Sequence, residues 1–356
     1  MGNNYVWGDD KVLGVAISSL ANPDIKWETT ATTDIGIDAS FFNNRVTLTA
    51  DYFYKKTSDI LLQLPIPGIV GVATEPYVNA AEVKNEGWEF ALGYNDQWND
   101  WRFGANLNLS TVKNEIIDLH GKESWITDWS INLEGYPINS YYGYVADGLY
   151  RDQAEVDQAN ENNTIGGGNL KLGDIRLKDI SGPDGTPDGV IDTYDRTVIG
   201  NPFPKVTYGL GINVAYKGID FSTFFQGVAG VDRVVMEFPK VSGNVTTRFL
   251  DRYSEELNPM GNFPRLGNGD YNSQPSSFWI KDASYLRLKN IELGYSFPQN
   301  WIRKAKLERL RIYISAQNLF TITGIDDYDP EKYSTDTRGF AYPNAKTFSI
   351  GLNVTL

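Results

Sequence analysis

The sequence of 356 residues contains no cysteine and only one histidine. Without cysteine, a disulfide framework, a thiolate zinc site and a thiol nucleophile are all excluded. The histidine, His120, has no serine or acid at a spacing typical of a catalytic triad, and we interpret it as an ordinary loop or strand-end residue. No other motif supports catalysis, so the sequence does not predict an enzyme.

Positive charge and long apolar runs are also scarce. The formal net charge of −13 argues against a nucleic-acid partner, because phosphate binding needs clustered Lys and Arg. No run approaches the roughly 20 apolar residues that a membrane-spanning helix requires. If the chain resides in a membrane, it must therefore cross as β-strands closed into a barrel. Residues 1–6 match neither a secretory signal nor a myristoylation motif, so we expect no export signal in the chain as given.

The sequence is rich in strict alternation of apolar and polar residues. A period of two predicts a strand with one apolar face and one polar face. The clearest case lies in residues 346–356, where the apolar positions are Phe348, Ile350, Leu352, Val354 and Leu356. The pattern recurs at 35–41, 46–54, 88–94, 101–109, 206–216, 221–225, 286–297 and 310–316. With weaker runs at 60–64 and 141–150, about ten to twelve antiparallel strands and no long helix are predicted.

One of these segments changes phase along its length. Between Leu288 and Ile291, near Asn290, the alternation slips by one residue. Such a slip predicts a bulge or a bend in the strand.

The predicted connections alternate between tight turns and long loops. The tight ones are 43–44, 95–99 and 217–218, and the long ones are 119–140, 151–204 and 230–276. Outer-membrane barrels have short periplasmic turns and long extracellular loops. Aromatic residues also lie at predicted strand ends, as two interfacial girdles require, namely Tyr54, Trp88, Tyr94, Trp101, Tyr216 and Phe297. The pattern favours an all-β transmembrane barrel, but a soluble β-sandwich stays open because alternation describes any half-buried antiparallel sheet.

Several short stretches resemble the carboxyl-terminal barrel of the SusC/RagA-type TonB-dependent outer-membrane transporters, and they follow one another in the same order as in that family. They are 22–29 (NPDIKWET), 34–38, 44–45, 51–55, 135–144, 147–148, 173–175, 196–205, 284–290, 317–320, 328–331 and the terminal strand. The resemblance implies an antiparallel barrel of about 22 strands with an amino-terminal plug, in the outer membrane of a Gram-negative, Bacteroidetes-type cell. It implies import of a nutrient, an oligosaccharide or a peptide, with energy from TonB. The implied partners are a SusD-like surface lipoprotein, TonB acting through the plug, and outer-membrane lipid.

The chain also departs from the family pattern. It is predicted to hold about half of the strands, and neither a plug domain nor a TonB box is recognised in it. It ends on Leu356, whereas family members usually end on an aromatic residue. We therefore interpret residues 1–356 as the carboxyl-terminal part of a transporter barrel, or as a truncated relative.

The strongest local motif lies in the long loop 151–204. Residues 184–195 carry oxygen ligands at positions 1, 3, 5, 9 and 12, glycine at 6 and a backbone carbonyl at 7, which is the spacing of an EF-hand calcium loop. The expected ligands are Asp184, Thr186, Asp188, Val190, Asp192 and Asp195. Asp179 and Ser181 offer a second register, and an Asx-type surface turn without metal is the alternative. We expect a structural calcium ion that holds the loop in one shape.

Substrate contacts are expected from the long loops and from the wet strand faces, because loop aromatics provide large contact areas at low entropic cost. The candidates for stacking on sugar rings or peptide side chains are Trp125, Trp129, Tyr141, Tyr142, Phe249, Tyr253 and Trp279. The alternative is that these residues pack their own loops together. The predicted function is outer-membrane nutrient uptake as part of a TonB-dependent importer. The alternative function is a soluble surface β-sandwich that binds calcium and glycan.

Overall fold

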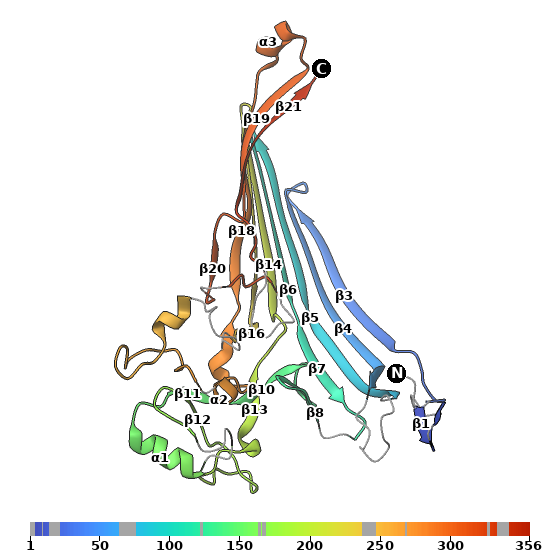
Figure 1. Ribbon diagram of the computed structural model, residues 1–356. Helices are drawn as coiled ribbons and strands as arrows, with labels where there is room; N and C mark the ends of the chain where they lie inside the picture. The colour runs from blue at the N-terminus through green and yellow to red at the C-terminus, as the bar shows by residue number, and fades with distance from the viewer. Residues whose placement is uncertain are drawn as a thin grey trace.

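The computed structural model describes residues 4–8, 10–13, 22–63, 76–121, 124–162, 165, 169–236, 247–267, 269–325, 328–332 and 342–356. Its main feature is one antiparallel sheet of eleven strands, called the wall below, which is the tall curved surface in Figure 1. Nine strands follow one another across the wall in the order β21-β19-β18-β15-β14-β6-β5-β4-β3. Two shorter strands extend it, since β7 pairs with β5 and β20 pairs with β18.

The bounds of these strands agree with the alternating segments of the sequence. They are Thr29–Phe41 (β3), Val46–Gln63 (β4), Tyr77–Trp98 (β5), Trp101–Thr111 (β6), Lys113–Asp118 (β7), Val206–Tyr216 (β14), Ile219–Ala229 (β15), Tyr285–Ser296 (β18), Arg309–Gln317 (β19), Thr321–Thr323 (β20) and Thr347–Thr355 (β21). The prediction of ten to twelve antiparallel strands is confirmed. The β-sandwich alternative is wrong, because the long strands of the described chain form one wall rather than two packed sheets.

The wall has an apolar face and a polar face. Cross-strand partners share a face, and Leu210 of β14 lies opposite Leu107 of β6 and Phe225 of β15. Ile350 on β21 is 80% exposed, and even Leu107, on a strand paired on both sides, is 40% exposed. A continuous exposed apolar surface of this kind requires an apolar environment such as lipid. On the opposite face, one row of neighbours across four strands is Asp51, Glu89, Ser110 and Thr207.

Aromatic rings mark two levels on the apolar face. At one level, the rings of Trp101 and Tyr216 stack with centroids 4.4 Å apart. At the other, the rings of Tyr52 and Trp88 lie 5.1 Å apart. On β5, the ten residue steps from Trp88 to Trp98 span roughly 33 Å along the strand. For a tilted strand, this length fits the roughly 25 Å apolar band of an outer-membrane barrel.

The phase slip predicted near Asn290 is confirmed as a β-bulge. Phe224 pairs with Asn290 and Phe225 pairs with Leu288, so Lys289 is the extra residue of β18. At the same point the other neighbour of β18 changes, from β19 along residues 290–296 to β20 along residues 285–287. The bulge therefore lies where one neighbouring strand ends and the next begins.

The connections divide between the two ends of the wall. Turns 42–45 and 99–100, turn 217–218 and connection 297–308 join neighbouring strands at the turn end, the upper end in Figure 1. The second turn is shorter than the predicted 95–99, because β5 continues to Trp98. Connection 297–308 contains α3 (Gln299–Ile302) and a 3-10 turn, η5 (Arg303–Ala305).

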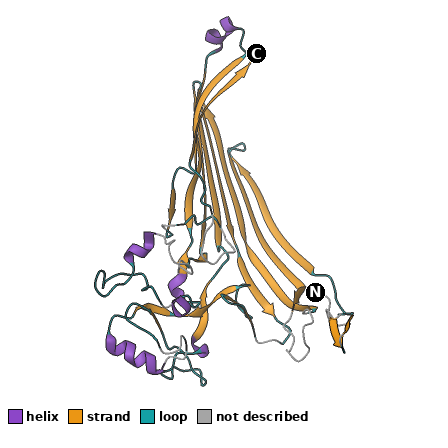
Figure 2. Ribbon diagram, viewed as in Figure 1, coloured by secondary structure: helices purple, strands orange, loops and turns teal. Residues whose placement is uncertain are grey.

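The long connections lie at the opposite end, called the loop end, which is the lower end in Figure 1. Connections 112–205 and 230–284 carry most of the remaining elements, and Figure 2 shows their helices beside the wall. The strands there are Trp125–Ile126 (β8), Ser130–Asn132 (β9), Ser140–Tyr144 (β10), Ala146–Leu149 (β11), Ile175–Leu177 (β12), Arg196–Gly200 (β13), Asp232–Val234 (β16) and Ile280–Asp282 (β17). The helical elements are Gln153–Asn162 (α1), Thr193–Asp195 (η2), Thr247–Asp251 (η3), Gly269–Asn272 (α2) and Ser277–Trp279 (η4).

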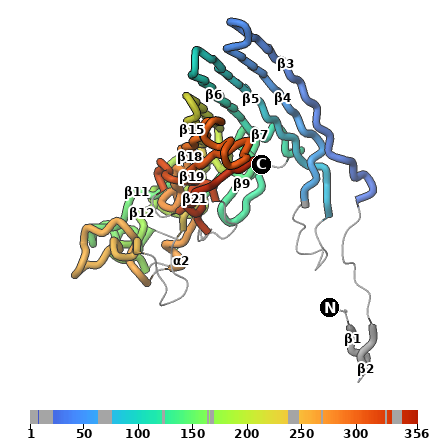
Figure 3. The backbone as a smooth tube through the Cα atoms, turned by 90° about the horizontal axis from the view of Figure 1, so that it is seen from above, coloured from blue at the N-terminus to red at the C-terminus, as the bar shows by residue number. Residues whose placement is uncertain are grey.

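The weak strand predicted at 141–150 forms β10 and β11 of the loop end, outside the wall. A separate hairpin of Asn4–Trp7 (β1) and Asp10–Leu13 (β2) precedes the wall in the chain. From above, in Figure 3, β3 to β6 follow one another as a curved surface. Within the described residues, no helix has the length and apolar character needed to cross a membrane.

Candidate functional site

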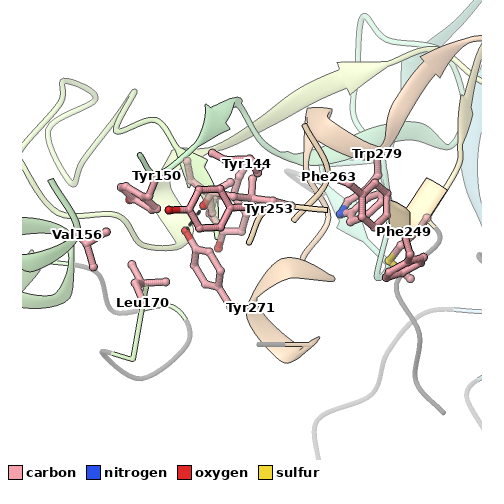
Figure 4. Close-up of a cluster of buried hydrophobic side chains, with 13 residues drawn as sticks. Tyr144, Tyr150, Val156, Leu170, Phe249, Tyr253, Phe263, Tyr271 and Trp279 are labelled. Carbon is pink, nitrogen blue, oxygen red and sulfur yellow. Dashed lines mark hydrogen bonds between the residues drawn. The ribbon is translucent and has the colours of Figure 1, made fainter. Parts of the chain in front are cut away.

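The two longest loops pack against each other through one buried apolar cluster (Figure 4). Connection 112–205 contributes Tyr144, Leu149, Tyr150, Val156, Leu170, Ile175 and Leu177. Connection 230–284 contributes Met236, Phe249, Tyr253, Phe263, Tyr271 and Trp279. Because each loop buries its apolar side chains against the other, the two loops form one folded unit, called the loop unit below.

Buried polar contacts also join the two halves of the loop unit. Asp174, which is fully buried, accepts a hydrogen bond from Asn272 Nδ2 at 2.9 Å and pairs with Arg265 Nε at 2.8 Å. The backbone N–H of Ile175 donates to Asn272 Oδ1 at 2.9 Å, and the Tyr271 hydroxyl donates to the Ile175 carbonyl at 2.9 Å. Buried polar groups are costly unless they are paired, so these contacts fix the relative position of the loops.

Four of the seven aromatic residues predicted to contact substrate are buried in the loop end. Tyr141, Phe249, Tyr253 and Trp279 are between 1% and 8% exposed. This burial favours the alternative that loop aromatics pack their own loops together, and their role in stacking on substrate stays a prediction. Trp279, for example, meets the Phe263 ring edge-on at 5.6 Å.

The other three predicted aromatic contacts are half-buried. Trp129 packs against the apolar cluster of the loop unit. The ring of Tyr142 lies under the guanidinium of Arg196, 4.6 Å from its centroid. Trp125 lies on the short strand β8.

The acidic stretch 184–195 folds as a turn in which carboxylates accept hydrogen bonds from the backbone. Asp195 is fully buried; its Oδ1 accepts from Ile180 N at 2.7 Å and Ser181 N at 3.1 Å, and its Oδ2 accepts from Asp192 N at 2.8 Å. Asp192 Oδ1 in turn accepts from Tyr194 N at 2.8 Å, which completes a capping box around η2. The last predicted calcium ligand therefore stabilises the turn directly.

The remaining predicted calcium ligands lie on the exposed side of this turn. Asp188 Oδ1 accepts from Val190 N at 2.9 Å, and Asp184 and Thr186 are exposed. Asp179 Oδ2 accepts from Gly189 N at 2.6 Å, while its Oδ1 is buried without a hydrogen-bond partner. Over the part of the chain that the structure describes, no three metal-ligating side chains converge. Calcium binding stays a prediction.

A cluster of ion pairs on the polar face joins β18 to connection 318–346. Arg287 donates to Asp329 Oδ1 at 2.6 Å, to Glu331 Oε2 at 2.5 Å and to Thr321 Oγ1 at 2.8 Å. The bulged residue Lys289 forms an ion pair with the same Glu331. The bulge thus directs a second cation towards the acids.

Asp329 is held in its charged form by this cluster. Burial alone would raise the pKa of its carboxyl group, but hydrogen bonds from Arg287 and from the backbone N–H groups of Asn344 and Glu331 lower that pKa below its ordinary value. Asn344 also donates through Nδ2 to Glu331 Oε2 at 2.6 Å. In the sequence, only the family resemblance at 328–331 pointed to this segment. The Asp329-Pro-Glu331 pattern alone does not tell which basic residues these acids would contact.

A second charged cluster lies on the polar face closer to the turn end. Arg311 of β19 donates through Nε to Asp220 Oδ1 at 3.0 Å and through Nη2 to Glu292 Oε1 at 2.7 Å. Gly294 makes room for it, because a Cβ there would lie 2.3 Å from Arg311 Nη2. Two carboxylates share one cation, so this cluster carries net negative charge.

The chain is similar to known proteins over nearly its whole length. Residues 1–319 match the family described as TonB dependent receptor-like, beta-barrel. TonB-dependent receptor P3 of Formosa agariphila is 32% identical over 380 residues, which cover 98% of this chain and 36% of that protein. TonB-dependent receptor SusC of Bacteroides thetaiotaomicron is 28% identical, with 94% and 32% covered.

A solved structure has the same fold. The RagAB peptide importer in its open-open state superposes with a TM-score of 0.77 and 25% identity, covering 100% of this chain and 37% of that chain. The named relatives are receptors and importers rather than enzymes. The chain spans about a third of the length of the relatives it matches, at 36% and 37%.

Proposed function

Because this chain belongs to the TonB-dependent receptor-like β-barrel family, we propose that it takes part in uptake of an oligosaccharide or a peptide across the cell outer membrane, within a SusC-like importer. The family is one of outer-membrane proteins, so the apolar face of the wall faces lipid and the polar face lines the lumen. The proposal rests on one observation: along nine strands, the apolar residues lie on one face of the wall and the polar residues lie on the other. A polar interior behind a lipid-facing wall is the arrangement through which a hydrophilic nutrient can pass.

Two partners belong to the proposal. A SusD-like surface lipoprotein would cover the loop end, where the loop unit offers a folded surface. TonB would supply energy from the periplasmic side. The likeness to the RagAB peptide importer and to SusC supports this assembly.

The test is uptake by cells. Deleting the gene should abolish import of one class of fluorescently labelled nutrient, either oligosaccharides or short peptides, and the wild-type gene should restore it. Import should also be lost in cells without TonB. Unchanged uptake of both classes in the deletion strain would contradict the proposal.

We also propose calcium as a ligand of the acidic turn 184–195. The spacing of its oxygen-bearing residues supports this, as does the unpartnered Oδ1 of Asp179. If residues 184–195 bind calcium as a twelve-residue loop, Asp195 must give up its hydrogen bonds to the backbone in order to coordinate the ion. Calcium should therefore change the shape of the turn. Calorimetric titration of the folded protein should give saturable heat that Asp188→Asn weakens. A titration without saturable heat would reject the calcium site.

A further inference from the structure

Phe224 is a large aromatic residue on the polar face of the wall. It lies opposite Gly211 on β14 and Asn290 on β18. Its neighbour Phe225 points to the apolar face, because successive strand residues alternate. Phe224 is 40% exposed, so part of its ring is open to the lumen.

Two glycines support the ring from below. A Cβ at Gly209 would lie 3.4 Å from Phe224 Cε2, and one at Gly211 would lie 3.9 Å from Phe224 Cδ2. The ring edge formed by Cδ2, Cε2 and Cζ therefore lies nearest to the backbone of β14. The exposed part of the ring is available as an apolar surface.

The ring stands at one end of a cavity of about 490 Å³ on the polar face. Small side chains form the middle of its floor, among them Ala91, Ser110 and Gly209. The cavity runs from β15 to β4, which is four interstrand steps, or roughly 19 Å at about 4.8 Å a step. This length suits a chain of several units rather than a single small molecule.

Polar side chains also line the cavity, together with residues of the same strands whose side chains face lipid. The amides of Asn108 and Gln226 lie near the aromatic end, and the carboxylates of Asp51 and Glu89 lie at the other end. Asp51 and Glu89 are direct cross-strand partners, an arrangement of like charges that destabilises a sheet. Neither forms an ion pair with another residue that the structure describes. The two acids thus cost stability and leave their oxygen atoms available as acceptors.

We propose that this cavity binds an uncharged oligosaccharide, with one sugar ring stacked on Phe224. The proposal rests on the importer function above and names its substrate class. A pyranose presents a face of C–H groups to the negative face of an aromatic ring, and its hydroxyl groups can bond to the amides and carboxylates. The acids disfavour an anionic sugar by charge repulsion.

The same surface is poorly suited to an extended peptide. Peptides are commonly recognised through the free backbone groups of a sheet edge. The cavity floor crosses β5, β6 and β14, which are paired on both sides. No backbone edge is therefore open at this place, and recognition must come from side chains.

The test is calorimetric binding to the full chain in detergent, with neutral oligosaccharides of glucose, xylose and mannose in α and β linkages. At least one should bind, and Phe224→Ala should weaken it about tenfold, roughly 1.4 kcal/mol. Phe224→Trp should keep the affinity, because it keeps an aromatic surface. Phe225→Ala, one residue away on the opposite face, is the matched control and should bind like the wild type. A uronic-acid analogue of the best ligand should bind more weakly, and Glu89→Gln should reduce that difference.

Several results would overturn the inference. Equal losses in Phe224→Ala and Phe225→Ala would show a structural effect instead of stacking. Import of peptides by wild-type cells, without binding of any neutral oligosaccharide, would reject the sugar assignment while leaving the importer function standing. A deletion strain that imports both classes normally would instead reject the importer function itself. Heat-modified migration on gels checks that each variant is folded.

Discussion

At the residue scale, the polar face depends on pairs in which a glycine makes room for a large side chain on the next strand. A Cβ at Gly351 would lie 2.1 Å from the ring of Tyr313, and Gly294 makes room in the same way for Arg311. The large side chains are thereby held flat along the sheet. The lumen keeps open space although its wall carries bulky groups.

Arg287→Ala should destabilise the contact between β18 and connection 318–346. The Arg287 and Asp329 side chains are each 4% exposed, and removal of one partner of a buried ion pair costs about 3–5 kcal/mol. Thermal unfolding in detergent, followed by gel migration, would measure the loss. Lys217→Ala is the control; it breaks an exposed pair with Asp100 at 3.5 Å and should cost less than about 1 kcal/mol. Equal effects of the two variants would contradict the assigned role of Arg287.

The same cluster predicts a dependence of stability on pH. The pKa of Asp329 lies below its ordinary value of 3.8, so its contribution is complete above that value and is lost as the pH falls through the lowered pKa. Wild type should therefore be more stable than Asp329→Asn at neutral pH, and the difference should shrink below about pH 4. Melting temperatures of both proteins from pH 3 to pH 7 would test this. A constant difference across that range would be inconsistent with it.

At the element scale, the bulge in β18 lies where the strand pairs with two successive neighbours along one edge. It lies where β19 gives way to β20, and its extra residue, Lys289, pairs with Glu331. A bulge of this kind bends a strand and redirects a side chain. The bulge thus absorbs the shift in the sequence alternation, and the apolar residues on both sides of it stay on one face.

Deletion of Lys289 should remove the bulge and leave both halves of β18 on their present faces. Leu288 and Ile291 lie on the same face although they are three residues apart, so without the extra residue the strand returns to strict alternation. The deletion variant should therefore keep the folded, heat-modifiable gel band. It should lose stability much as Lys289→Ala does, because both variants lose the ion pair with Glu331. Loss of the folded band in the deletion variant alone would show that the bulge itself is needed for assembly.

The face assignment of β14 can be tested with adjacent residues. Ile212→Arg should cost about 2–4 kcal/mol, because an arginine near the middle of the lipid-facing band is poorly solvated. Asn213→Arg, on the polar face, should have a much smaller effect. The free energies of unfolding of the two variants would be compared in lipid vesicles. If Asn213→Arg were the less stable variant, the assignment of the two faces would be wrong.

The wall could be predicted from sequence because its signals are local. Period-two alternation and the slip near Asn290 are both visible in consecutive residues. The loop unit could not be predicted from sequence, because its contacts join distant segments. Ile175 and Asn272, for example, are 97 residues apart. The loop aromatics were therefore assigned to substrate, although several are buried.

The candidate sites were predictable only in part. Spacing identified the acidic turn, but spacing does not tell whether Asp195 faces an ion or the backbone N–H groups that it contacts in the structure. Phe224 was missed, although a signal was present. The pair Phe224-Phe225 interrupts the alternation, so one of the two rings had to lie on the polar face.

At the scale of the whole molecule, the exposed apolar face determines how the protein behaves in solution. Ile35, Ile314 and Phe348 are all well exposed on that face, at both margins of the wall. The protein should need detergent or lipid to remain dispersed. Size-exclusion chromatography would show this as aggregation when detergent is removed. A monodisperse peak in plain buffer would contradict a membrane position for the wall.

The shared core of the loop unit bears on how such proteins could be re-engineered or diversify. Val156 and Leu170 come from one loop, Tyr271 and Trp279 come from the other, and all four pack in one cluster. A loop grafted alone from a relative would meet a foreign partner and leave part of that cluster unfilled. Exchange of binding properties between relatives should therefore succeed only when both loops are transplanted together, as one inherited module.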